Sequence, residues 1–144
     1  MAALRQLPAS AQTLLGSDAL AHVITVGSDG LPQVSVVWCG IKDNDVLFCT
    51  EEKSTKVRNL RKNPRIVISI EDEMRNRAGT QHHLVLHGTA EILGPADPKL
   101  CDELCAAYTG RANHPTNLGQ SSTAVTVAVH VDRIGGNGPW VDGD

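Results

Sequence analysis

Short β-branched runs separated by turn-forming residues restrict the fold of this sequence more than any other feature. Asp29-Gly30, a strong hairpin turn signal, separates the first run from the second, and the polar stretch 42–45 separates the second from the third. Valine, isoleucine and threonine favour the extended backbone of a strand. About six such runs with few helices predict a mainly β protein, a β-barrel with flanking helices. The predicted strands cover residues 21–26, 33–38, 46–50, 65–70, 81–93 and 124–131.

The order and alternation of these runs add two expectations. Only short turns separate the first three runs, so we expect them to form a three-stranded meander. Along the fifth run, Leu84 and Leu86 alternate with His83, Val85 and His87. Successive side chains of a strand point to opposite faces, so the two leucines should lie on one face and the other three residues on the opposite face.

Three segments carry helix signals. Ser54 is a favourable N-cap residue, and Pro64 cannot continue a helix, so a helix is expected from Ser54 to about Asn63. A helix over residues 9–15 should follow Pro8, and another should open at Asp97-Pro98 and end at Tyr108. Residues 71–80 are expected to be irregular, 110–122 to form a polar loop, and the glycine-rich segment 135–139 to be a linker.

Size and composition indicate one globular domain over residues 1–144. Hydrophobic residues make up 41% of the 144 residues and charged residues 20%, which is ordinary for a globular chain. No internal repeat or linker divides the sequence before its glycine-rich end. A domain of this size has little room for a deep enclosed pocket, so a ligand site would form more readily between subunits.

Several classes of function are disfavoured by composition. The net charge of -3 and an aromatic content of 3% argue against nucleic-acid binding. No apolar stretch is long enough to span a bilayer and no signal-peptide pattern opens the chain, so we expect a cytoplasmic protein with no membrane partner. The four cysteines include no Cys-x-x-Cys pair, so we expect reduced, packed thiols and no metal site.

Basic residues concentrate between positions 51 and 65. These 15 positions hold six of the 13 Lys and Arg residues and only two acids. A helix N-terminus already carries about half a positive charge, yet Lys56 lies in the first turn of the expected helix. Together with the Ser54 and Thr55 hydroxyls and the unpaired N–H groups, Lys56 would form a phosphate site. The other basic residues of this segment can equally form a solvated helix face.

Motifs in this order resemble those of a known family. They are the turn segment 29–35, the helix Lys56-Val57-Arg58-Asn59-Leu60-Arg61 followed by Asn63-Pro64-Arg65, and the strand His87-Gly88-Thr89-Ala90-Glu91. From about Ala21 to Ile134, the chain resembles the pyridoxamine 5'-phosphate oxidase-like superfamily, also called the flavin/deazaflavin oxidoreductases. The basic helix and Gly138-Pro139-Trp140 are most similar to the actinobacterial branch that uses the deazaflavin coenzyme F420.

This resemblance implies a fold, an assembly and a set of site residues. The fold would be a split β-barrel of the FMN-binding-protein type, in a homodimer with two coenzyme sites at the subunit interface. His83 stands where flavin oxidases place a ring-contacting Gln, and Trp140 would be either a lid over the ring or an anchor for the tail. The coenzyme-binding residues implied are Ser35, Val36, Cys49, Thr50, Ser54, Thr55, Lys56, Asn59, Arg61, His83 and Trp140.

Departures from the family pattern bear on function. A pyridoxamine phosphate oxidase would have an Arg near Val34, an Arg at Thr55 and a C-terminal Arg-x-His; their absence argues against vitamin B6 oxidation and weakens an FMN phosphate clamp. No catalytic dyad or triad is visible, and a coenzyme that carries the hydride needs none. We therefore expect an F420-dependent reductase acting on a small electron-poor acceptor. The alternatives are an FMN-binding oxidoreductase of the same superfamily and a non-enzymatic coenzyme or small-ligand carrier.

Overall fold

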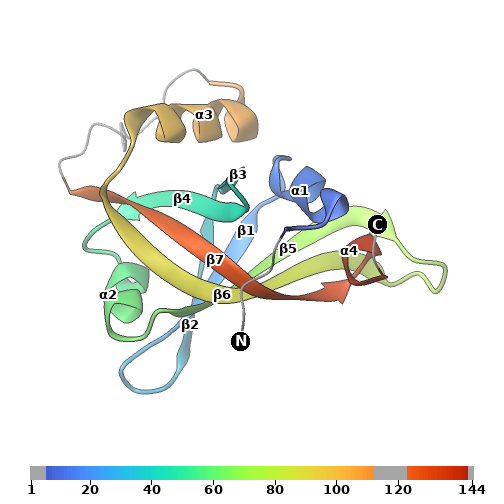
Figure 1. The fold of residues 1–144 in the computed structure, drawn as a ribbon, viewed down its shortest axis with the longest axis horizontal. Helices are drawn as coiled ribbons and strands as arrows, with labels where there is room; N and C mark the ends of the chain where they lie inside the picture. Colours follow the sequence, from blue (N-terminus) through green and yellow to red (C-terminus); the bar gives the residue numbers. More distant parts are fainter. Residues whose placement is uncertain (1–5, 112–122, 143–144) are drawn as a thin grey trace.

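A computed structural model of the protein describes residues 6–111 and 123–142 (Figure 1). Seven antiparallel strands form one sheet in the order β2-β1-β5-β6-β7-β4-β3. Strands β2 and β3 are its two edges, so the sheet does not close completely. The prediction of a mainly β split barrel is confirmed. The strands are β1 (Ala21–Val26), β2 (Pro32–Val37), β3 (Gly40–Lys42), β4 (Asp45–Glu51), β5 (Arg65–Arg75), β6 (Gln81–Pro95) and β7 (Ala124–Asn137).

Four helices flank this sheet in the described part of the chain. They are α1 (Ala9–Leu15), α2 (Thr55–Lys62), α3 (Pro98–Thr109) and α4 (Pro139–Asp142). Helix α3 lies over β4, α2 packs against β1 and β2, and α1 contacts α4 near the other end of the molecule (Figure 1). The three predicted helices are confirmed, and the Ser54 hydroxyl accepts a hydrogen bond from the backbone N–H of Val57 at 3.4 Å, as expected of an N-cap.

The predicted turn at Asp29-Gly30 is confirmed, but the predicted meander is wrong. Strands β1 and β2 pair as a hairpin, and Gly30 has φ 80°, which glycine adopts without steric cost. Strand β4, however, pairs with β3 and β7 and not with β2. A β-branched run favours a strand without specifying its partner, and here the partner lies more than 70 residues further along the chain.

The inward faces of the strands form the core. Leu84 and Leu86 are fully buried, while His83, Val85 and His87 on the opposite face are half-buried, so the predicted alternation is confirmed. The core continues through apolar side chains of every strand except β3, and the largest of these are Phe48, Ile66, Ile68 and Ile70.

All four cysteines are free. Within the described ranges, no helix is both long and apolar enough to cross a membrane.

Strands β5 and β7 run further than the sequence suggested. Strand β5 continues to Arg75, into a segment expected to be irregular, and β7 continues to Asn137 through the glycine-rich segment. Gly135 and Gly136 pair with β6. The prediction of a linker in this segment was therefore wrong, because these glycines allow the backbones of β6 and β7 to approach closely. The predicted loop over 110–122 lies largely outside the described residues.

Candidate functional site

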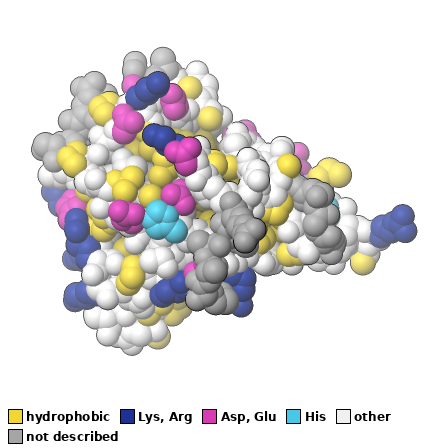
Figure 2. Space-filling model, viewed as in Figure 1, with side chains coloured by type: hydrophobic (Ala, Val, Ile, Leu, Met, Phe, Trp, Pro, Cys, Tyr) yellow, Lys and Arg dark blue, Asp and Glu magenta, His cyan; other side chains and the backbone are white. Residues whose placement is uncertain are grey.

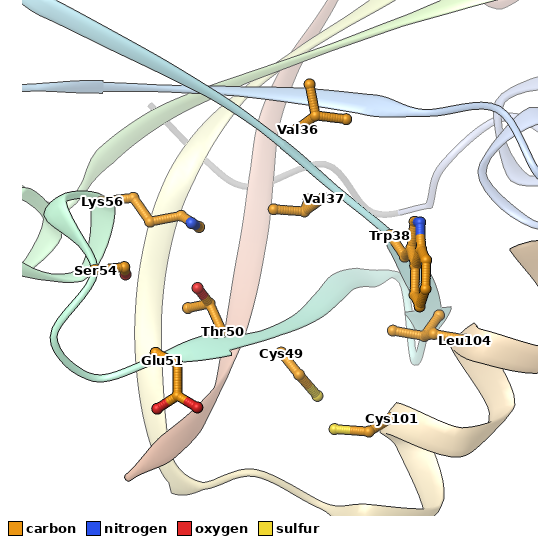
Figure 3. Close-up of a pocket in the computed structure, with 10 residues that line it drawn as sticks. All are labelled: Val36, Val37, Trp38, Cys49, Thr50, Glu51, Ser54, Lys56, Cys101 and Leu104. Carbon is orange, nitrogen blue, oxygen red and sulfur yellow. The ribbon is translucent and has the colours of Figure 1, made fainter. Parts of the chain in front are cut away.

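A pocket of about 430 Å³ opens between β2, β4, the first turn of α2 and helix α3 (Figure 3). Its volume falls within the range of small-molecule sites, about 300–1,000 Å³. The pocket is lined by Val36, Val37, Trp38, Cys49, Thr50, Glu51, Ser54, Lys56, Cys101 and Leu104.

Lys56 forms the polar end of this pocket. Its side chain extends from the first turn of α2 into the pocket, close to Ser54 and Thr50 (Figure 3). Burial lowers the pKa of Lys56, because a half-buried ammonium loses part of its hydration. Lys56 has no ion pair with any described residue. Glu51 also lines the pocket, but its side chain points away from Lys56 and accepts a hydrogen bond from the Thr123 hydroxyl at 2.7 Å.

The opposite end of the pocket is aromatic and apolar. Trp38, Leu104 and the thiols of Cys49 and Cys101 lie there, and the two sulfur atoms point toward one another (Figure 3). Burial raises the pKa of both thiols, so they stay neutral at ordinary pH. The pocket therefore has one cationic end and one uncharged end.

Five of the eleven predicted coenzyme-binding residues line this one pocket. They are Val36, Cys49, Thr50, Ser54 and Lys56, which come from three separate segments of the chain. The structure thus brings together the strand ends and the helix start that the sequence singled out. Their binding of a coenzyme stays a prediction.

Thr55, Asn59 and Arg61 lie outside the pocket. Thr55 and Asn59 are four residues apart and therefore neighbours on the surface of α2. The Thr55 hydroxyl accepts a hydrogen bond from Arg58 at 3.2 Å, and the buried Asn59 amide donates to the Thr25 hydroxyl at 3.1 Å. Arg61 forms an ion pair with Glu52, with nitrogen–oxygen distances of 2.5–2.9 Å. In this chain the three residues contact protein groups.

Ser35, His83 and Trp140 do not line the pocket either. Ser35 precedes Val36 on β2, and its hydroxyl oxygen is buried without a hydrogen-bond partner among the described residues. His83 lies on β6, where its backbone oxygen accepts a hydrogen bond from the Trp140 indole at 3.2 Å. Trp140 is 5% exposed and belongs to the core, so it anchors the C-terminal segment of this chain.

Sequence reasoning missed the residues that α3 contributes. Cys101 and Leu104 form one wall of the pocket, but no pattern in the sequence indicates that α3 packs beside β4. Trp38 and Val37 were also missed as individual residues. For these two a signal existed, because they directly follow Val36, which the resemblance implied as a coenzyme-binding residue.

The residues of the pocket fit a coenzyme with a phosphate and a flat ring. The Lys56 ammonium and the Ser54 and Thr50 hydroxyls can donate to phosphate oxygens, while Val37 offers an apolar surface beside them. Throughout the described residues, no group of three or more His, Cys, Asp and Glu side chains is placed to hold a metal ion. A nucleotide-like organic coenzyme therefore matches the donor set.

The fold and the pocket together define a split-barrel protein with a candidate ligand site that is cationic at one end. The family model described as pyridoxamine 5'-phosphate oxidase matches residues 7–135, and the chain belongs to this family. It is a family of the oxidoreductase superfamily whose members bind flavin-type cofactors. No protein among those with curated descriptions matches the chain significantly.

Solved structures share the fold at low sequence identity. An F420 reductase is 23% identical with a TM-score of 0.71, and the match covers 86% of this chain and 94% of that one. A conserved hypothetical protein from Mycobacterium tuberculosis is 23% identical with a TM-score of 0.70 over 93% and 88% of the two chains. General Stress Protein 26 from Bacillus anthracis is 17% identical with a TM-score of 0.64 over 92% and 91%. At these identities the likeness establishes the fold.

Proposed function

We propose that this protein is an oxidoreductase that uses coenzyme F420 and transfers a hydride from the reduced coenzyme to a small electron-poor acceptor. The observation that carries the proposal is the half-buried Lys56 ammonium, which enters the pocket without an ion-pair partner among the described residues. A cation that has lost hydration gains most from a bound anion. The similarity in fold to a protein named F420 reductase supports the same conclusion.

In this proposal the chain supplies binding, orientation and exclusion of water. Lys56, Ser54 and Thr50 hold the coenzyme phosphate, and the Val37 side chain provides an apolar wall for the ring. When bound, the reduced deazaflavin supplies the hydride, so no protein acid or base has to begin the reaction. Apolar side chains around the ring exclude water and therefore limit the loss of reducing equivalents to solvent.

The charge at the polar end favours F420 over FMN. FMN carries a phosphate monoester with a charge between about −1.5 and −2 at pH 7, whereas the phosphodiester of F420 carries a single negative charge. Lys56 is the one cationic side chain among the described residues that line the pocket. Thr55 does not line the pocket and adds no donor there. A single lysine balances a diester better than a monoester.

Titration of the purified protein with F420 tests this proposal. We expect saturable binding, seen as a change in coenzyme fluorescence, and at least about tenfold weaker binding for Lys56→Gln because one charge-assisted hydrogen bond is lost. Lys62→Gln is the matched control, since Lys62 is an exposed lysine of the same helix that does not line the pocket. Unchanged fluorescence, or equal effects of the two substitutions, would contradict the proposal.

Two further measurements separate the alternatives. A purified protein that is yellow and binds FMN more tightly than F420 would identify an FMN enzyme. Binding of reduced F420 without oxidation by any of a panel of quinones, enones and nitroaromatics would instead identify a coenzyme carrier. We expect Lys56-dependent binding of F420 together with turnover of at least one acceptor class.

We also propose that the working form is a homodimer. Strand β2 is an edge of the sheet, and its Val34 and Val36 side chains are 57% and 51% exposed, next to Leu31 at 64%. Exposed apolar residues on an edge strand are unfavourable in a monomer. Light scattering should give twice the mass of the chain, and Val34→Glu should shift the protein toward monomer. A monomeric wild-type protein at micromolar concentration would overturn this proposal.

A further inference from the structure

Trp38 stands at the end of the pocket opposite Lys56, and its indole is packed against another aromatic ring. It follows β2 directly, and Tyr108 of α3 stacks on it with ring centroids 5.7 Å apart and planes inclined by 16°. Parallel aromatic rings at this separation are a favourable arrangement. The indole therefore has a fixed neighbour on one side and also forms part of the pocket wall (Figure 3).

Hydrogen bonds of the Tyr108 hydroxyl hold this pair in place. The hydroxyl accepts from the backbone N–H of Cys39 at 3.2 Å, and the carbonyl oxygens of Ala19 and Cys39 lie at 3.1 and 3.2 Å as acceptors for its proton. Cys39 is the next residue after Trp38. One side chain of α3 thus fixes both the ring and the backbone beside the indole.

The described residues that line the Trp38 end of the pocket are uncharged. The neighbouring pocket residues Leu104, Cys49 and Cys101 are apolar or thiol-bearing, and the two charged residues that line the pocket, Lys56 and Glu51, lie toward its other end (Figure 3). An indole is electron-rich on its face, so it attracts an electron-poor ring more strongly than a saturated molecule of similar size. An uncharged flat ligand loses little hydration on entering such a site.

We propose that Trp38, held by Tyr108, forms the acceptor subsite of the pocket and selects flat, uncharged, electron-poor aromatic compounds. The inference rests on the proposed function, because it assigns a substrate class to the same pocket. It separates the pocket into a coenzyme-phosphate end at Lys56 and an acceptor end at Trp38. Trp38 is thereby a specificity-determining residue, and Tyr108 a positioning residue.

Binding of two matched probes tests the proposal. 1,3-Dinitrobenzene is flat and electron-poor, whereas nitrocyclohexane has a saturated, puckered ring. Calorimetry with saturating oxidised coenzyme should show a preference for dinitrobenzene of at least about fivefold, retained in Trp38→Phe and lost in Trp38→Leu. The coenzyme affinity of both variants should stay within about twofold of the wild type, since Lys56 is untouched. An unchanged preference in Trp38→Leu, or a loss that falls on the coenzyme instead, would overturn the proposal.

Tyr108 provides a second pair of variants in case Trp38→Leu does not fold. Tyr108→Phe keeps the stacked ring and removes the hydroxyl, while Tyr108→Leu removes both, so only the second should lose most of the preference for the flat probe. Equal behaviour of the two would contradict a stacking role. Circular dichroism and urea unfolding establish that each variant is folded.

Tryptophan fluorescence can show where the probe binds. The chain has only two tryptophans, so replacing one of them leaves a single indole as the reporter. In Trp140→Phe the remaining indole is Trp38, and dinitrobenzene should quench it saturably. In Trp38→Phe the remaining indole is Trp140, and quenching should be weak and linear. Equal saturable quenching in both would place the probe elsewhere.

The same measurements distinguish failure of this inference from failure of the proposed function. If no coenzyme binds but the Trp38-dependent preference persists without coenzyme, the F420 proposal fails and the aromatic subsite stands. If coenzyme binding depends on Lys56 but probe binding is indifferent to Trp38, the subsite fails alone.

Discussion

The side-chain amide of Asn59 donates a hydrogen bond to the hydroxyl of Thr25 at 3.1 Å, and both side chains are buried. This contact joins α2 to β1. The first turn of the same helix presents Lys56. Asn59 therefore supports the candidate site by fixing the helix and does not itself line the pocket.

Asn59→Ala should destabilise the protein with a smaller effect on ligand binding. The Thr25 hydroxyl would lose its donor in a buried position, which costs about 1–3 kcal/mol in the free energy of unfolding. Urea unfolding measures this loss. Thr55→Ala, an exposed change on the same helix face, should stay within about 0.5 kcal/mol of the wild type. If Asn59→Ala keeps full stability but weakens coenzyme binding as strongly as Lys56→Gln, Asn59 is a ligand after all.

Local signals in the sequence predicted the parts of the site that depend on a few neighbouring residues. The Ser54 hydroxyl caps α2 by accepting a hydrogen bond from a residue only three positions further along the chain. The position of Lys56 in the first turn of the helix was enough to predict its part in the site. The strand that carries Cys49 and Thr50 was also predicted from a local run of strand-forming residues, and the family resemblance then implied that these two residues belong to the site. Each of these rests on steric and hydrogen-bonding preferences within one element, which sequence patterns record directly.

Contacts between distant elements could not be predicted in the same way. The wall that Cys101 and Leu104 contribute depends on α3 packing beside β4, some 50 residues earlier in the chain. The burial of Trp140 likewise depends on its hydrogen bond to His83 and on α1. Packing of one apolar surface on another is not directional, so many pairings satisfy the same pattern.

Gly136→Ala should be strongly destabilising, and Gly94→Ala only moderately so. Both glycines have positive φ, 94° and 108°, so an alanine is strained at either position. A Cβ at Gly136 would also lie 2.1 Å from the backbone oxygen of His83, whereas a Cβ at Gly94 would meet nothing within 4 Å. We expect losses of about 1–2 kcal/mol for Gly94→Ala from strain alone, and clearly more for Gly136→Ala. Equal losses in thermal unfolding would show that β6 and β7 do not approach this closely.

Trp140→Ala should cost about 3–5 kcal/mol of unfolding free energy, the usual range for a buried tryptophan. The indole is 5% exposed, packs in the main core and donates to the His83 carbonyl at 3.2 Å. Trp140→Phe keeps most of the apolar volume and should retain more of the stability. Denaturant unfolding and limited proteolysis of the C-terminus measure the effect. A Trp140→Ala protein of wild-type stability would indicate that the C-terminal segment is not anchored.

His130 joins three adjacent strands through two carboxylates. Its Nε2 lies 2.8 Å from Glu91 of β6, and its Nδ1 lies 3.0 Å from Asp45 of β4. Figure 2 shows a histidine on this face among acidic side chains. The hydrogen bonds to Glu91 and then to Asp45 raise the pKa of His130, because both carboxylates stabilise the imidazolium.

The contribution of His130 to stability should therefore be present in mild acid and lost in base. Since its pKa is raised on folding, the stabilisation is complete below the unfolded value of about 6.5 and disappears as the pH rises through the higher folded value. The side chains are 32–59% exposed, so we expect the destabilisation by His130→Gln to be at most about 1 kcal/mol larger near pH 6 than near pH 9. An NMR titration should give an imidazole pKa above 6.5 in the wild type and a lower one in Glu91→Gln. A His130 titration unaffected by Glu91→Gln would show that this ion pair does not persist in solution, and the pH-dependent difference should then vanish as well.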